Sequence, residues 1–80
     1  MFFVYVLRSE VDNRLYVGFT ESIERRVKEH NCGKTRSTKG YIPWNLVYTE
    51  EIFDRKSARI REKYLKSGFG KEYLKKILAP

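Results

Sequence analysis

The sequence predicts one small domain of mixed α/β (α+β) fold over residues 1–80, with elements in the order β-β-α-β-α-α. Three observations support this prediction. The chain has 80 residues, which is the length of a single domain. Its hydrophobic fraction of 41%, with 15% aromatic residues, is enough for a modest core and argues against disorder. Runs of β-branched and aromatic residues alternate with helix-like segments, and turn or capping residues separate them.

The first two expected elements form a β-hairpin. Residues 2–7 are a run of aromatic and β-branched side chains typical of a buried strand, and residues 15–19 form a second short strand. Asp12 and Asn13 lie between them and are favourable turn residues. Two strands this close along the chain, with a turn between them, indicate antiparallel pairing.

A helix over residues 21–31 follows the hairpin. Thr20 or Ser22 can cap its N-terminus, acidic side chains occupy its first turn, and Gly33 comes just after its end. The next ten residues, 34–43, are polar and contain a glycine and a proline, so we expect a loop there.

The remaining segment predicts a strand and two helices. Residues 44–53 form a third strand interrupted by polar residues, and Asp54 is a suitable N-cap for a helix over residues 55–66. The serine and the two glycines within residues 67–70 are expected to end that helix. Residues 72–78 then form a last short helix.

Several classes of protein are excluded. The chain has no run of 18 apolar residues, so no membrane span is expected. Its apolar start reaches Arg8 without a basic region before it, unlike a secretion signal. Cys32 is the single cysteine and there is one histidine, so neither an intramolecular disulfide nor a Cys/His zinc site is available. We therefore expect a soluble, cytoplasmic protein.

Charge is unevenly distributed along the chain. The formal net charge is +7, and residues 52–80 contribute nine basic and three acidic side chains, a net +6. An excess of this kind indicates a polyanionic partner such as nucleic acid or an anionic membrane surface. The alternative is that the charges form a solvated helix face.

Both longer helices carry polar residues on or beside an apolar face. At 100° per residue, Arg26 and His30 lie one turn apart at the edge of the inward stripe of their helix. Taken singly, each is better explained by packing at the edge of the core. Glu62 falls within the apolar face of its helix, and a buried carboxylate needs a partner. Either Arg26 or a metal ion could be that partner.

The hairpin carries two tyrosines and a glycine that could belong either to the core or to a functional site. Tyr5 lies on the first strand and Tyr16 on the second, where aromatic side chains usually pack across strands. Gly18 is less easily explained by packing, because a glycine in a strand often marks a close approach of backbone or ligand.

Taken together, these residues resemble the GIY-YIG nuclease superfamily. Within it, the chain is most similar to short single-domain bacterial members like the N-terminal nuclease module of the excision-repair protein UvrC. The resemblance covers essentially the whole chain. The motifs that carry it, in order, are Val4-Tyr5-Val6, Tyr16-Val17-Gly18, Gly18-Phe19-Thr20, Arg26-x-x-x-His30-Asn31-x-Gly33 and Ala58-x-x-x-Glu62-x-x-x-Lys66.

The resemblance implies a three-stranded antiparallel sheet flanked by helices, and metal-dependent hydrolysis of a DNA phosphodiester bond. By the same resemblance, Tyr16 is the general base that activates a water, with Tyr5 beside it. Arg26 binds the scissile phosphate, His30 orients or supports the nucleophile, and Glu62 is the one protein ligand of Mg²⁺ (or Mn²⁺). The family often has an asparagine near the C-terminal end, and none follows Asn45 in this sequence.

The basic side chains outside these motifs are candidates for phosphate contacts. Such contacts are independent of sequence, so we expect a preference for DNA structure, such as branched, nicked or flap substrates in repair or recombination. The alternatives are a non-catalytic nucleic-acid-binding module of the same fold, and an interaction protein with a structural Arg26–Glu62 pair. The candidate nucleic-acid-binding residues are Lys34, Arg36, Lys39, Arg55, Lys56, Arg59 and Lys63.

Overall fold

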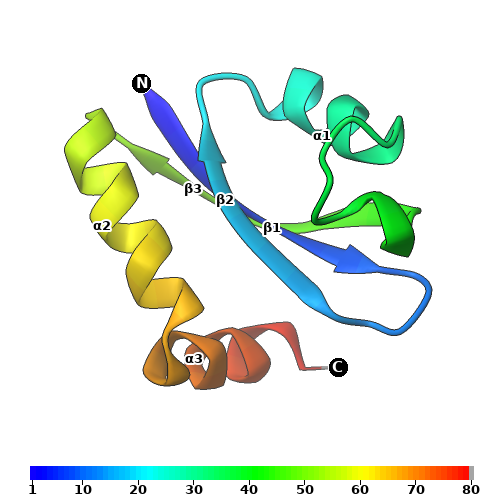
Figure 1. Ribbon diagram of the computed structural model, residues 1–80. Helices are drawn as coiled ribbons and strands as arrows, with labels where there is room; N and C mark the ends of the chain where they lie inside the picture. Colours follow the sequence, from blue (N-terminus) through cyan, green and yellow to red (C-terminus); the bar gives the residue numbers. More distant parts are fainter. Residues whose placement is uncertain (80) are drawn as a thin grey trace.

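A three-stranded antiparallel sheet with strand order β2-β1-β3 organises the molecule (Figure 1). The structure is a computed structural model that describes residues 1–79. The predicted fold class and the order β-β-α-β-α-α are confirmed. The elements are β1 (Phe2–Ser9), β2 (Leu15–Thr20), α1 (Ile23–Asn31), the short 3₁₀ turn η1 (Lys39–Tyr41), β3 (Trp44–Ile52), α2 (Arg55–Lys66) and α3 (Gly68–Leu78).

The two faces of the sheet carry different clusters of buried side chains, because successive residues of a strand point to opposite faces. The β1 residues Val4 and Val6 face α2 and α3, whereas Tyr5 and Leu7 face the other way. The first cluster comprises Val4, Val6, Val17, Ala58, Leu65 and Leu74. The second comprises Tyr5, Leu7 and Trp44, with Tyr16, Val27, Tyr41 and Ile42 packed against it. The two tyrosines of interest therefore belong to the second, more polar cluster.

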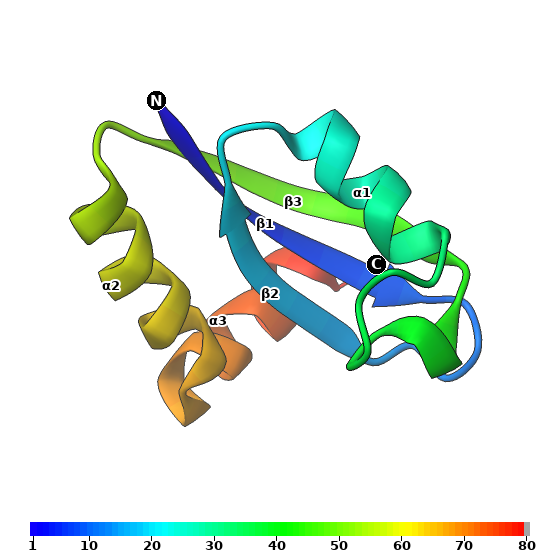
Figure 2. The same ribbon diagram turned by 45° about the horizontal axis from the view of Figure 1, so that its top comes forward.

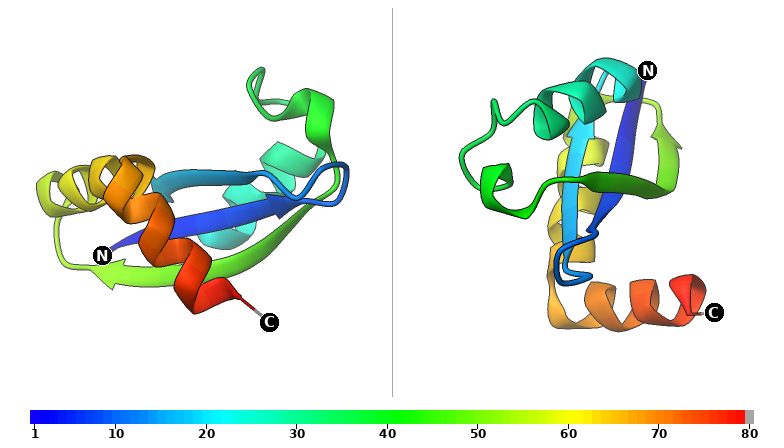
Figure 3. Two further views of the ribbon diagram at one scale, coloured as in Figure 1. Left: turned by 90° about the horizontal axis from the view of Figure 1, so that it is seen from below. Right: turned by 90° about the vertical axis from the view of Figure 1, so that its right-hand side faces the viewer.

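The helices lie around the sheet so that both α1 and α2 are close to β2. In Figures 1 and 2, α1 and α2 lie on opposite sides of β2, which is an edge strand of the sheet. Figure 3 shows α3 lying across the end of α2. Within residues 1–79, the structure contains no helix that is both long enough and apolar enough to span a bilayer.

The hairpin turn and the helix caps follow the sequence closely. Asn13 adopts a left-handed conformation with φ of 62°, and the Asp12 carboxylate accepts a hydrogen bond from the Arg14 backbone N–H. Ser22 caps α1 by accepting a hydrogen bond from the Arg25 N–H, so α1 begins at Ile23, two residues later than predicted. Asp54 caps α2 as expected, with its carboxylate 2.7 Å from the Ser57 nitrogen.

The prediction that residues 67–70 end α2 is confirmed, whereas the predicted start of the last helix was wrong. These residues do end α2, but α3 begins immediately at Gly68 and not at residue 72. Ser67 is both the last cap of α2 and the N-cap of α3, where its hydroxyl accepts from the Gly70 N–H. A Cβ on Gly70 would lie only 2.0 Å from the Tyr64 carbonyl oxygen, so this glycine permits the close approach of α3 to α2. The serine and glycines suggested a loop at residues 67–70, whereas in the structure Gly70 lets the backbone of α3 lie against the backbone of α2.

Candidate active site

Tyr5 lies at the centre of the site because β1 is the middle strand of the sheet. It is 1% exposed, and it pairs across the hairpin with Gly18. A Cβ on Gly18 would lie 2.6 Å from the Tyr5 hydroxyl and 2.8 Å from its Cζ. The glycine therefore marks a close approach, as the sequence indicated, and the approaching group is the phenol of Tyr5.

A buried chain of hydrogen bonds fixes the Tyr5 hydroxyl. It lies 2.9 Å from Nε2 of His30, and Nδ1 of His30 lies 2.8 Å from the Thr38 hydroxyl. Because the Thr38 hydroxyl donates to the Thr35 carbonyl, it accepts the Nδ1 proton of His30. His30 then carries no proton on Nε2, and Nε2 accepts the hydroxyl proton of Tyr5. His30 and Thr38 are both fully buried, so water does not compete for these bonds.

Tyr16 is packed beside this chain but remains half-buried. Its ring centroid lies 4.8 Å from that of His30 and 6.3 Å from that of Tyr5. The amino group of Lys66 lies 5.8 Å from the centre of the Tyr16 ring. Among residues 1–79, no protein group hydrogen-bonds the Tyr16 hydroxyl, which leaves this phenol available to a bound molecule.

Burial sets the protonation states of the inner two groups. Burial, with a smaller contribution from Tyr16, raises the pKa of Tyr5 to about 12, while the Arg26 charge opposes the shift. Burial also lowers the pKa of His30 to about 4, and Arg26 adds to that effect. At neutral pH, Tyr5 is therefore a protonated donor and His30 a neutral acceptor, in agreement with the hydrogen-bond chain.

Arg26 supplies a positive charge that acts on Tyr5. Its guanidinium bonds to the Glu29 carboxylate at 2.9 Å and to the Thr35 hydroxyl at 3.2 Å. Arg26 also lines a surface hollow of about 410 Å³ together with Arg25 and Arg55. Three arginines and two glutamates, Glu21 and Glu29, therefore line this hollow, and the Arg26 charge is partly balanced by Glu29.

Glu62 is buried as predicted, but its ion-pair partners among residues 1–79 are Lys66 and Arg59 and not Arg26. The Glu62 carboxylate is 11% exposed and lies 3.2 Å from the Lys66 amino group and 4.0 Å from the Arg59 guanidinium. It forms no ion pair with Arg26, so the alternative of a structural Arg26–Glu62 pair is wrong. Its partner Lys66 also lies 5.8 Å from the centre of the Tyr16 ring, so Lys66 links Glu62 to the tyrosine cluster.

The donor set fits a weakly held Mg²⁺. No group of three or more His, Cys, Asp or Glu side chains gathers within residues 1–79, so a closed metal cage is absent from this part of the chain. Mg²⁺ commonly binds through one or two carboxylates, with water and phosphate oxygens completing its coordination. The buried Glu62 carboxylate is suited to that arrangement.

The predicted basic residues are all exposed, and they divide into two groups. Three lie in the segment after α1 and four on α2, beginning at its N-terminus. Of the seven, Arg55 shares a hollow with Arg26. The residues are Lys34, Arg36 and Lys39 in the first group, and Arg55, Lys56, Arg59 and Lys63 in the second.

Sequence reasoning missed two threonines that complete the site. Thr38 holds the imidazole of His30, and Thr35 bonds to Arg26. Both belong to a segment predicted only as a polar loop. The three short hydroxyl residues Thr35, Ser37 and Thr38 give no signal by themselves, because the contacts join residues eight and nine positions apart in the chain.

Comparison with known proteins is consistent with this geometry. The family model of the GIY-YIG catalytic domain matches residues 1–76. The chain is 49% identical over 66 residues to a UPF0213 protein of Natronomonas pharaonis, covering 81% of this chain and 76% of that protein. It is 36% identical over 77 residues to a UPF0213 protein of Staphylococcus haemolyticus, covering 95% and 92% of the two chains.

A solved structure extends the similarity to the whole fold. The solution NMR structure of a UPF0213 protein from Bacillus halodurans superimposes with a TM-score of 0.59 at 33% sequence identity. The similarity covers 100% of this chain and 89% of the other. On the sequence match, the fold and these relatives, the chain belongs to the GIY-YIG catalytic domain family, which is of nuclease type.

Proposed function

We propose that this protein is a metal-dependent endonuclease that hydrolyses a phosphodiester bond of DNA, acts in the cytoplasm, and prefers branched, nicked or flap structures in repair or recombination. One observation carries the proposal. A half-buried tyrosine with a free hydroxyl, Tyr16, lies against a rigid pair formed by Tyr5 and His30. Arg26 and the buried carboxylate of Glu62 both influence this cluster through their charges.

Each step of hydrolysis has a side chain suited to it. Within residues 1–79 no protein group bonds to the Tyr16 hydroxyl, so Tyr16 can take the proton from the attacking water. Arg26 holds a non-bridging oxygen of the phosphate and stabilises the charge that develops there. The Tyr5 hydroxyl donates to neutral His30, and this hydrogen bond holds in place the ring that Tyr16 packs beside.

Glu62 is the side chain that would hold the metal ion. A bound Mg²⁺ or Mn²⁺ neutralises charge on the phosphate and stabilises the leaving oxygen. Lys66 and Arg59 both lie beside the Glu62 carboxylate and help to position it. With a single carboxylate, we expect the ion to bind tightly only when DNA adds its phosphate oxygens.

The test is a cleavage assay on labelled flap, nicked, bubble and plain duplex DNA with Mg²⁺ or Mn²⁺. Tyr16→Phe and Glu62→Gln should each reduce cleavage on the order of 10²–10⁴-fold, the usual contribution of a general base or comparable group. Lys76→Gln, an exposed cation of α3, is the matched control and should cleave normally. Wild-type rates in both site variants would reject the mechanism.

One observation favours a second candidate function, a non-catalytic nucleic-acid-binding module. Lys66 already occupies the Glu62 carboxylate at 3.2 Å, and no asparagine follows Asn45. This candidate predicts salt-dependent binding of the same DNA panel with no metal-dependent strand breaks. The cleavage assay therefore separates the two functions.

A further inference from the structure

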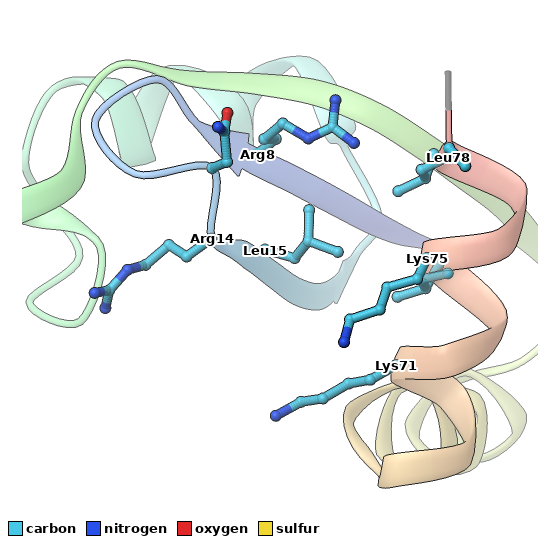
Figure 4. Close-up of a pocket in the computed structure, with 9 residues that line it drawn as sticks. Arg8, Arg14, Leu15, Lys71, Lys75 and Leu78 are labelled. Carbon is cyan, nitrogen blue, oxygen red and sulfur yellow. The ribbon is translucent and has the colours of Figure 1, made fainter.

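The structure contains a second basic hollow, distant from the tyrosines, between the β-hairpin and α3. It has a volume of about 710 Å³, and none of the residues that line it is acidic. Figure 4 shows Lys71 and Lys75 reaching from α3 toward the hairpin, and Arg8 reaching from β1 toward the end of α3. The floor is apolar and is formed by Leu15, Leu74 and Leu78.

This hollow lies on the face of the sheet opposite to the candidate active site. Arg8 pairs with Leu15 across the hairpin, whereas the preceding pair joins Leu7 and Tyr16. Neighbouring pairs point to opposite faces of a sheet, so the hollow and Tyr16 are separated by the sheet itself.

The charges in the hollow are largely free to bind a ligand. Among residues 1–79, neither Arg8 nor Lys71 forms an ion pair, and Lys75 has only the exposed Glu72 at 3.7 Å. An exposed pair of this kind is weak. Arg14 also lines the hollow, but its guanidinium is bonded to Asp12 and lies over the Tyr41 ring, so its charge is less available to a ligand. Three cations therefore surround an apolar floor without a competing carboxylate on the wall.

We propose that this hollow binds a single-stranded segment of nucleic acid. The cations match the phosphates, and the leucine floor matches the sugars and bases that a single strand exposes. A duplex keeps its bases stacked inside and offers only phosphates, which would leave the leucines without a partner. The choice of nucleic acid rests on the proposed function. A protein that binds duplex on one face and an unpaired strand on the other recognises a branched or flap substrate.

The test uses the full chain in EDTA, so that no cleavage occurs, with an all-thymine strand of about eight nucleotides as probe. Binding is followed by NMR of the leucine methyl groups and by fluorescence anisotropy over a range of salt. The methyl signals of Leu15, Leu74 and Leu78 should shift together and saturate. Each lost phosphate contact should reduce the slope of log K against log [salt] by about 0.7 for a single strand.

The matched variants remove equal charge from different places. Lys71→Gln with Lys75→Gln should reduce the slope by about 1.4, twice the value for one contact, and should abolish the leucine shifts. Lys28→Gln with Lys76→Gln removes two exposed cations that do not line the hollow, and should retain both the slope and the shifts. Equal losses in the two double variants, or shifts confined to the tyrosine face, would overturn the inference.

Two further arms separate this inference from its alternatives. An oligoglutamate peptide that shifts the same methyl groups at equal or lower concentration would overturn it in favour of an acidic protein partner. Cleavage of the DNA panel is measured separately from strand binding. If the wild-type chain cleaves nothing while the leucine shifts persist, the endonuclease proposal fails and the second binding site stands. If plain duplex is cleaved but the leucines do not respond, the second site fails alone.

Discussion

Substitution of Gly18 by alanine should destabilise the protein strongly, because the added methyl group competes with Tyr5 for the same space. The new Cβ would lie 2.6 Å from the Tyr5 hydroxyl and 2.8 Å from its Cζ, where ordinary contacts are 3.4–4 Å. Tyr5 is 1% exposed and cannot swing into solvent. Its ring must therefore shift away from His30, and the 2.9 Å hydrogen bond between them is lost or stretched.

Two costs add up in this variant. Overpacking of a core typically costs about 1–3 kcal/mol, and leaving a buried polar group unsatisfied costs about 1–3 kcal/mol more, so the expected loss is about 2–6 kcal/mol. In a domain of this size each kcal/mol lowers Tm by roughly 4–8 °C, so Tm should fall by about 10 °C or more. Thermal and urea unfolding followed by circular dichroism measure the change.

The control is Gly40→Ala, because a Cβ at Gly40 meets nothing within 4 Å. It should change the free energy of unfolding by no more than about 0.5 kcal/mol. A cycle with Tyr5→Phe gives a second check: the hydroxyl is the atom nearest to the new Cβ, so the two substitutions should be less destabilising together than their sum. Equal stability of the two alanine variants, or strict additivity in the cycle, would refute the packing argument.

Three other predictions follow from the same contacts. The pKa of His30 is lowered to about 4 from an ordinary value of 6.5, so between these pH values the unfolded chain binds more protons than the folded one. The free energy of unfolding should therefore be full above pH 6.5 and fall by up to about 3 kcal/mol as the pH drops to 4. Urea midpoints measured across that range should show this dependence, and His30→Gln should lose it. Thr38→Val leaves Nδ1 of His30 without an acceptor and should cost about 1–3 kcal/mol, whereas Ser37→Ala, at a neighbouring exposed hydroxyl, should be neutral in the same unfolding experiment. Gly70→Ala should unfold at much lower temperature than Gly68→Ala, since only the former meets backbone atoms, and a Tm equal in both would contradict the close helix contact.

Local sequence signals predicted the elements well where a local interaction determines them. Asp12 and Asn13 form the predicted turn, and Asp54 caps α2, because each acts on backbone groups two or three residues away. Residues 67–70 show where such reasoning stops. Their composition favours a break, but the outcome depends on whether α3 can approach the backbone of Tyr64 and Leu65, which is a contact between two elements.

The candidate site shows the same division. Helical spacing placed Arg26 and His30 one turn apart and put Glu62 on the buried face of α2, and the structure has all three there. The partners of these side chains were not predictable from spacing. Glu62 bonds to Lys66 on its own helix, and His30 is held by Thr38 from a segment whose sequence suggested only a loop. Which groups meet depends on how the segment around η1 folds back over α1.

The junction at Ser67 has a mechanical consequence. One residue both finishes α2 and starts α3, and Gly70 seats α3 directly against the backbone of Leu65, so no spacer is left to absorb a displacement. The two helices therefore form a rigid corner. Lys71 lies on one arm of this corner and Glu62 on the other, so the contact at Gly70 fixes how the cations of α3 stand relative to the carboxylate of α2.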